Sequence, residues 1–135
     1  MAKKKTNLKK LHRKLYELWK EVAKRECGIT CLCCGRPAAH MHHYIPKSKS
    51  LALRYDLLNA IPLCNKCHYS IHFSNNPEVI RQLCEIIRKR KGEEWCFYIE
   101  TKRREQAKNA LWYFEPILKH LEDVWNKHGV SVVDL

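Results

Sequence analysis

The N-terminal part of the chain has a helical pattern of apolar residues. Its apolar positions are Leu8, Leu11, Leu15, Leu18, Trp19 and Val22. Spacings of three and four place them on one face of a helix, with lysines around the rest. Thr6 or Asn7 can cap this predicted basic helix over residues 6–27, and Gly28 lies just past its end. Such a helix can dock on a core or read DNA, and the pattern leaves both alternatives open.

The middle of the chain predicts short strands followed by a helix. Residues 29–75 contain most of the cysteines and histidines and show little helical periodicity before Cys64. We expect strands near AAHMHHYIP and NAIPLC, joined by a loop through KSKSLALRYDLL. A helix should begin near Asn65, because His68 and His72 lie four positions apart and therefore share one helix face.

The remaining part, residues 76–135, predicts a helical region. In NNPEVIRQLCEIIRKRKG, Asn76 can cap a helix, Pro77 suits its first position and Gly92 suits its end. A second helical stretch runs through WCFYI.

A last helix is predicted from apolar positions that run from Ala107 to Trp125. Pro116 would kink or split this helix. Three tryptophans of the helical region can serve a helical interface or the core of a monomer, and we favour the core; they are Trp95, Trp112 and Trp125.

Length and charge limit the class of protein. A chain of 135 residues makes one compact domain rather than two full cores, so we expect a single domain over residues 1–135. The net charge of +12 favours a polyanionic partner, most commonly nucleic acid. Residues 1–26 hold ten Lys and Arg against three acids, whereas residues 109–135 hold two against four. A nucleic-acid surface should therefore involve the first helix and the middle of the chain.

An anionic membrane is the other polyanionic partner to consider. No segment approaches the roughly 18 consecutive apolar residues that cross a bilayer. The start, MAKKKTNLKK, has the positive charges of a secretory signal but no apolar run behind them. We therefore expect a soluble, intracellular protein with no membrane partner.

The cysteines of the chain predict a metal site. Eight cysteines in an intracellular protein indicate metal rather than disulfides, because reducing compartments keep thiols free. Cys31-x-x-Cys34 and Cys64-x-x-Cys67 are matched pairs about thirty residues apart. Each pair makes a tight turn that points two thiolates at one ion, and two such turns close a tetrahedral site. These cysteines predict a structural Zn²⁺, although Cys33 can substitute for a neighbour.

The histidines next to these cysteines are then free for another task. In a strand, His42 and His43 point to opposite faces and should differ in function. His68 and His72 can chelate one divalent ion from one helix face. The cysteine staple ties the start of that helix to the segment before His42, so all four should lie within reach of one centre. The other histidines are expected to be ordinary surface or core residues; they are His12, His40, His120 and His128.

The order of these residues resembles the HNH nucleases, whose active site is a ββα-metal motif. The pattern is His-His, then Asn sixteen positions on, then Cys-His-x-x-x-His. It covers residues 31–73, including HHYIPKSKS, RYDLLNAIPLCNKCH and SIH. The resemblance implies an α+β fold, with a ββα-metal (HNH) core and four-cysteine zinc staple over residues 28–75, flanked by N-terminal and C-terminal α-helices. It also implies a metal-dependent DNA endonuclease that hydrolyses phosphodiester bonds.

The resemblance implies roles for individual residues. His43 is similar to the general base that activates the attacking water, and Asn59 to the residue that supports the loop and orients the base. His42, His68 and His72 resemble the ligands of a catalytic divalent metal, which stabilises the leaving oxygen. A shell of histidines alone favours transition metals over Mg²⁺, so Mg²⁺, Mn²⁺, Ni²⁺ and Zn²⁺ all stay open.

Other features concern the substrate. Lys47, Lys49 and Arg54 lie in the loop between His43 and Asn59, where they can bind DNA or be solvated. The layout, with helices on both sides of the motif, resembles phage recombination nucleases of the NinG or Rap type. That resemblance implies a phage-encoded, structure-specific enzyme in the host cytoplasm. Those proteins tend to have a single His and Cys-Asn where this chain has His-His and Cys-His.

Two other classes of protein remain open. One is a non-catalytic zinc-stapled DNA-binding module, and the other is a metal-stapled protein-interaction module that uses the C-terminal helices. Within the nuclease class, the pattern does not decide between DNA and RNA, or between double-stranded and branched DNA. An HNH motif nicks one strand per site, so a homodimer that cuts both strands is an open alternative.

Overall fold

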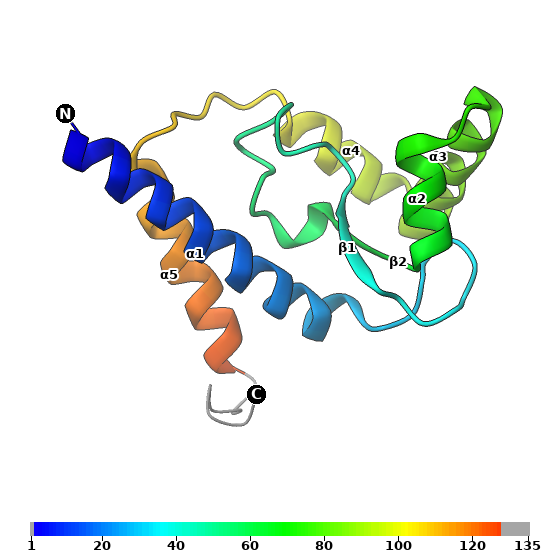
Figure 1. Ribbon diagram of the computed structural model, residues 1–135, viewed down its shortest axis with the longest axis horizontal. Coiled ribbons are helices and arrows are strands. Elements are labelled where there is room, and N and C mark those ends of the chain that lie inside the picture. The colour runs from blue at the N-terminus through cyan, green and yellow to red at the C-terminus, as the bar shows by residue number, and fades with distance from the viewer. Residues whose placement is uncertain (1, 128–135) are drawn as a thin grey trace.

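The computed structural model describes residues 2–127 (Figure 1). Its longest element, α1 (Ala2–Cys27), begins before Thr6 and Asn7, so neither residue caps it and that part of the prediction is wrong. The alanine and lysines before Thr6 are good helix formers and extend the helix toward the N-terminus. The helix ends at Cys27 as predicted, where Gly28 has a φ of 87° that favours glycine.

Two short antiparallel strands lie at the centre of the fold. β1 (His40–His43) pairs with β2 (Ala60–Leu63), with His42 opposite Ile61. A short 3₁₀ turn, η1 (Leu57–Asn59), leads into β2, and α2 (Asn65–Phe73) follows it. The predicted strands and the helix start at Asn65 are confirmed, and the α+β fold has the order strand, strand, helix of a ββα motif.

Two further helices follow the ββα unit. α3 (Pro77–Lys91) begins as predicted, because the Asn76 side chain accepts a hydrogen bond from the backbone N–H of Glu78 at 3.0 Å. It ends at Gly92, whose φ of 96° breaks the helix. α4 (Glu93–Lys102) then starts directly after this glycine.

The last helix, α5 (Leu111–Lys127), starts later than predicted, so Ala107 and Ala110 lie outside it. The carbonyl of Ala110 accepts the backbone N–H of Phe114, which places Ala110 at the cap rather than within the helix. Pro116 lies inside α5, which continues past it without a split.

The tryptophans divide between core and surface. Trp95 and Trp125 are buried as expected, but Trp112 is 65% exposed, so that expectation is wrong. The buried stripe of α5 contains Phe114, Leu121 and Trp125. Trp112 lies two positions before Phe114 and therefore on the other side of the helix.

Two groups of buried residues hold the elements together. One joins the hairpin and the cysteine loop to α3 and α4, with Ile61, Leu63 and Ile87 at its centre. The other lies between α1, α5 and the loop before β2, with Leu15 and Phe114 as large members. α1 and α5 pack along each other on one side of the hairpin, and α2 and α3 lie at the other end (Figure 1). Among the described helices, none is both long and apolar enough to span a bilayer.

Candidate metal centres and active site

The four cysteines of the two matched pairs converge. Their sulfur atoms all lie within 4.8 Å of one another, and Cys34 Sγ is 3.5 Å from Cys64 Sγ. Gly35, with a φ of 79°, donates its N–H to the Cys31 carbonyl and so closes the first turn. In the second pair, Cys64 caps α2 by accepting the backbone N–H of Cys67 at 3.4 Å.

The donor set of this cluster fits a zinc ion. Ligands at the usual Zn–S distance of about 2.3 Å in a tetrahedron lie roughly 3.8 Å apart, close to the observed separation. The backbone N–H of Cys67 helps to lower the pKa of the Cys64 thiol to about 6, which favours the thiolate that binds metal. Cys33 is not part of the cluster, since its thiol donates to the carbonyl of Leu83 at 3.9 Å. The predicted four-cysteine site therefore has the geometry of a zinc staple, without Cys33.

A second convergent group is formed by three histidines. One nitrogen from each of His42, His68 and His72 lies within 4.8 Å of the other two. His42 comes from β1, whereas the other two lie one turn apart on α2. The Nε2 atoms of His68 and His72 are 3.1 Å apart. This matches the separation of about 3 Å that neighbouring nitrogens have when they bind one ion at about 2.1 Å.

The environment of His42 and His68 favours their neutral forms. Burial, together with the neighbouring His72, His68 and His43, lowers the pKa of His42 to about 3. Burial also lowers the pKa of His68, with His72 and His40 contributing. Because a histidine binds metal only in its neutral form, these shifts favour metal binding by His42 and His68. Three ligands leave coordination positions free for a substrate oxygen or water.

His43 is oriented separately from the three convergent histidines. Its Nε2 lies 2.8 Å from the backbone carbonyl oxygen of Arg54. A carbonyl can only accept, so Nε2 must carry the proton and Nδ1 is left with the free lone pair. His43 follows His42 on β1, and the alternation of the strand sends the two rings to different sides, as predicted. The arrangement thus fixes one tautomer with a single basic nitrogen.

Aromatic rings from α1 pack against His43. The centroid of the Trp19 indole is 4.0 Å from that of the imidazole, with 15° between the planes, and Tyr16 lies parallel at 6.2 Å. Burial is the main cause that lowers the pKa of His43 to about 4; the Arg54 carbonyl opposes this shift, and the positive charges of Lys47 and Arg54 add to it. His43 is therefore neutral and able to accept a proton at neutral pH.

Asn59 is fully buried and holds the loop that supports His43. Its Oδ1 accepts the N–H of Ile45 at 2.8 Å, and its Nδ2 donates to the carbonyls of Ile45 and Leu53. The side chain of Asn59 thus bonds to backbone groups of the loop rather than to the His43 ring. Leu53 precedes Arg54, whose carbonyl holds His43, so Asn59 is linked to His43 through the backbone.

A cleft of about 540 Å³ contains the histidines and part of the cationic surface. It is lined by His42, His43, His68 and His72, and by Tyr16, Lys20, Lys24 and Lys47, among others. Of the three loop residues predicted to bind DNA, only Lys47 lines this cleft. Arg54 instead donates to the Lys47 carbonyl, at 2.8 and 3.1 Å, and Lys49 is exposed away from the cleft.

Several other histidines also have defined positions. His40 lies on the rim of the cleft, where its Nε2 donates to Asn65 Oδ1 at 2.6 Å and its ring is 4.6 Å from that of His68. His12 bonds to Tyr55 and Asn109. His128 lies outside the described residues. The contributions of Tyr16, Trp19 and His40 were missed from the sequence, because no local pattern signals a contact made across the fold.

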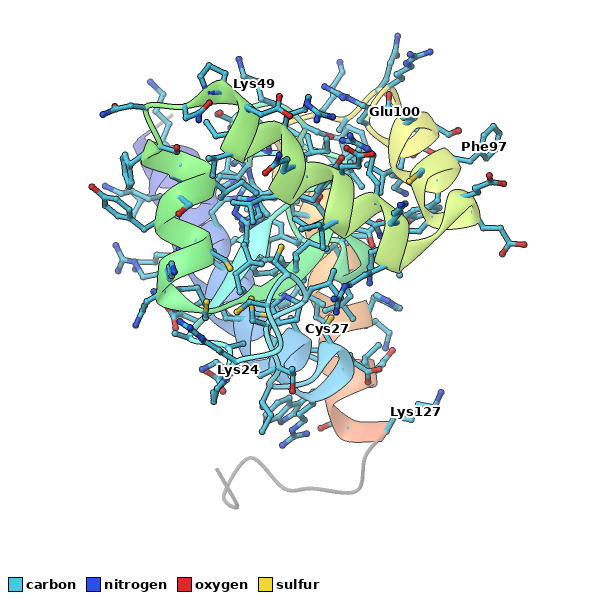
Figure 2. The ribbon with its side chains drawn as sticks, turned by 90° about the vertical axis from the view of Figure 1, so that its right-hand side faces the viewer. Lys24, Cys27, Lys49, Phe97, Glu100 and Lys127 are labelled. Atoms are coloured by element: carbon cyan, nitrogen blue, oxygen red, sulfur yellow. The ribbon has the colours of Figure 1, made fainter. Side chains whose placement is uncertain are left out.

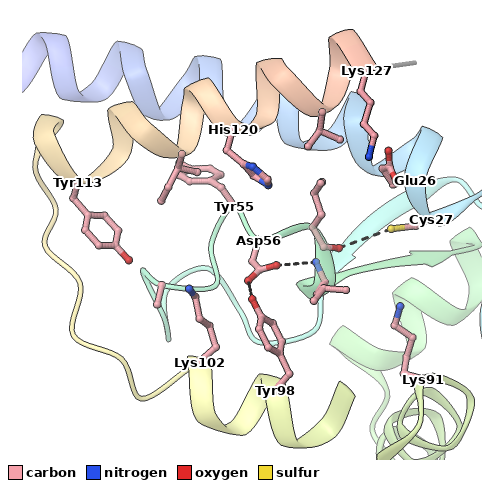
Figure 3. A pocket seen from close by; sticks show the side chains of 15 residues that line it. Glu26, Cys27, Tyr55, Asp56, Lys91, Tyr98, Lys102, Tyr113, His120 and Lys127 are labelled. Atoms are coloured by element: carbon pink, nitrogen blue, oxygen red, sulfur yellow. Dashed lines mark hydrogen bonds between the residues drawn. The ribbon is translucent and has the colours of Figure 1, made fainter. Parts of the chain in front are cut away.

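A larger hollow of about 920 Å³ lies away from the three convergent histidines, between α1, α4 and α5 (Figure 3). Tyr98 donates a hydrogen bond to the Asp56 carboxylate there, and Lys102 and His120 are also in its wall. Neither convergent ligand group found in the described residues lies in this hollow. The three convergent histidines instead line the smaller cleft.

Comparison with known proteins agrees with this geometry. The family model described as HNH endonuclease matches residues 26–74, so this part of the chain is similar to the HNH endonucleases. No match was found among curated proteins or among solved structures. The matched residues include both cysteine pairs, the ββα unit and all the histidines of the cleft. The resemblance to NinG or Rap-type nucleases stays a prediction.

Proposed function

We propose that the chain is a metal-dependent endonuclease that hydrolyses DNA phosphodiester bonds. One observation carries the proposal: His43, held in a single tautomer by the Arg54 carbonyl, lies in the same cleft as the three convergent nitrogens of the histidine group. A base and a cation site side by side are what hydrolysis of a phosphodiester requires. The match to the HNH endonuclease family supports the same reaction.

In this proposal the residues of the chain have separate tasks. His43 accepts a proton from the attacking water at Nδ1, because Nε2 is occupied by the carbonyl. Asn59 is a positioning residue that fixes the loop behind the base. His42, His68 and His72 would hold a divalent cation, which would supply a Lewis acid for a phosphate oxygen and would stabilise charge on the leaving oxygen. The cysteine cluster holds zinc and keeps α2 in place.

The charge of the cleft supports a nucleic-acid substrate. Lys20 and Lys24 from α1 and Lys47 from the loop line it beside the histidines. With a net charge of +12, the chain should bind polyanions in a manner that weakens as salt is raised. More specifically, we propose a phage-encoded enzyme that acts on branched recombination intermediates.

Nicking of supercoiled plasmid tests the proposal. The zinc-loaded wild type is compared with His43→Ala in the presence of Mn²⁺, Mg²⁺, Ni²⁺ or EDTA, with His120→Ala as the matched control on α5. We expect metal-dependent nicking that falls about 10²- to 10⁴-fold in His43→Ala and is unchanged in the control. Plasmid that is bound but never nicked with any metal, or equal nicking by His43→Ala, contradicts the catalytic assignment and favours a DNA-binding module.

A further inference from the structure

Two exposed aromatic rings lie beside the histidine group, on the outer side of α2. Tyr69 and Phe73 are each 66% exposed, and their ring centroids are 5.2 Å apart. The ring of Phe73 is also 5.9 Å from that of His72. Two large rings that leave most of their surface in water add little to the stability of the fold. Such a patch next to a functional cleft indicates a binding surface.

Helix geometry places these rings in a row with a positive charge. Residues three, four and seven positions apart lie on one side of a helix, so the exposed Lys66 shares a side with Tyr69 and Phe73. The metal-ligand row, His68 and His72, lies one position back along the chain and about 100° around the helix. α2 thus presents metal ligands on one side and an adjoining row of one lysine and two aromatic rings, here named the aromatic ledge.

The cleft is therefore bordered by two different surfaces. The wall formed by α1 and the β1–β2 loop presents Lys20, Lys24 and Lys47 to the cleft. Lys20 and Lys24 also form surface ion pairs with Glu17 and Glu21, and solvent weakens these interactions. The aromatic ledge adjoins His68 and His72, the two histidines that α2 contributes to the cleft. A nucleic-acid strand has the same two kinds of surface, a phosphate backbone on one side and flat aromatic bases on the other.

We propose that Tyr69 and Phe73 stack on unpaired bases next to the phosphate that lies in the cleft. The position of the phosphate in the cleft rests on the proposed nuclease function. The stacking of bases on the two rings does not depend on that function. Bases in an intact duplex stack on one another and expose only their edges, so the faces of the two rings can be used only by unpaired bases. The chain should therefore prefer single-stranded or locally unpaired DNA to regular duplex.

Binding without cleavage tests this preference. The zinc-loaded full chain is titrated, without added divalent metal, into a short single strand that contains 2-aminopurine and into the same strand paired as a duplex. Anisotropy of a separate dye reports affinity, and quenching of 2-aminopurine reports stacking on a ring. The variants are the double variant Tyr69→Ala with Phe73→Ala, the single variant Tyr69→Trp, and the control Phe97→Ala. The ring of Phe97 is 76% exposed and points outward from α4 (Figure 2).

We expect the wild type to quench 2-aminopurine in the single strand. The double alanine variant should lose this quenching and bind the single strand about 10-fold more weakly for each ring removed, with a change of less than about 3-fold for duplex. Tyr69→Trp should keep both properties, because its ring is also flat, and Phe97→Ala should match the wild type.

Three results would overturn the inference. The first is that the double alanine variant loses affinity equally for single strand and duplex. The second is that Phe97→Ala loses as much affinity as the double variant. The third is that the double variant binds both substrates normally but changes from dimer to monomer in sedimentation. The last result would assign the ledge to a second copy of the chain. A wild type that stacks on the single strand but never cleaves with any metal supports the ledge and contradicts the nuclease function, so the two failures are distinguishable.

Discussion

The imidazole of His43 lies on the indole of Trp19, with 4.0 Å between ring centroids and 15° between the planes. Trp19 is fully buried, and its Nε1 donates to the carbonyl of Asp56 at 2.9 Å. The indole is thus fixed at its edge and presents its face to the base. Trp19 lies outside the segment that matches the HNH family, residues 26–74, so α1 adds a wall to the histidine cleft from outside that segment.

Changing Trp19 should reduce the rate of cleavage. In Trp19→Leu the imidazole loses its flat support and can turn about the bond to the Arg54 carbonyl, and small misplacements of a catalytic group cost up to about 10²-fold in rate. Trp19→Phe keeps an aromatic face and should lose less. The measurement is plasmid nicking at saturating metal, with zinc content as the check on folding. Equal rates in Trp19→Leu and wild type would show that the stack does not orient the base.

The metal ligands could be predicted from the sequence because their spacing is local. Cys31 and Cys34 close one turn, Cys64 and Cys67 another, and His68 and His72 lie one helical turn apart. Such spacings fix which side chains can meet before anything is known of the rest of the fold. Each local pair follows from short-range geometry, whereas the meeting of the two cysteine pairs, and of His42 with the α2 histidines, depends on the fold.

Contacts made across the fold had no such signal. Trp19 reads as one more apolar position of an amphipathic helix, and nothing in its neighbours indicates that it faces His43 from 24 positions away. The prediction that Trp112 is buried was wrong. Its large apolar side chain favours burial, but its position on α5 leaves it exposed. Residue type is a weak guide when the packing partner lies on another element.

Removal of Asn59 should destabilise the loop behind the base. Asn59→Ala leaves the N–H and carbonyl of Ile45 and the carbonyl of Leu53 without their side-chain partner in a buried site. Buried polar groups without partners cost about 1–3 kcal/mol each, so we expect a loss of about 3 kcal/mol or more in the free energy of unfolding. Urea denaturation of the zinc-loaded chain measures this loss.

A matched control for Asn59 is Asn109→Ala, since Asn109 accepts a hydrogen bond from His12 at the surface. We expect the control to change the free energy of unfolding by less than about 1 kcal/mol. If Asn59→Ala were as stable as this control, the three hydrogen bonds of Asn59 would not hold the loop.

Loss of one cysteine ligand should remove the zinc and, with it, the position of α2. Cys64 is both a ligand and the cap of α2, so Cys64→Ser weakens the metal site and should lower the melting temperature of the whole chain. Cys96→Ser is the control, because Cys96 lies outside the cluster. The measurements are zinc content and thermal unfolding by circular dichroism. A zinc-free Cys64→Ser chain that unfolds at the wild-type temperature would contradict a structural role for the ion.

The stability of the fold should fall at alkaline pH because of Tyr98. Its hydroxyl donates to the Asp56 carboxylate, which also caps η1 through the N–H of Leu58 (Figure 3). Burial raises the pKa of Tyr98 above its ordinary value, and the carboxylates of Asp56 and Glu105 raise it further. Above about pH 10 the unfolded chain loses this proton while the folded chain keeps it, so the free energy of unfolding decreases as the pH rises.

Tyr98→Phe should remove this part of the pH dependence. The variant loses the hydrogen bond to Asp56, so at pH 7 it should be less stable than the wild type by about 1 kcal/mol. Between about pH 10 and 11 the wild type should lose stability more steeply, so that the two free energies of unfolding approach each other. Tyr69→Phe, at an exposed tyrosine, provides the control and should follow the wild type. Parallel curves for wild type and Tyr98→Phe across this range would show that the folded chain does not hold the proton.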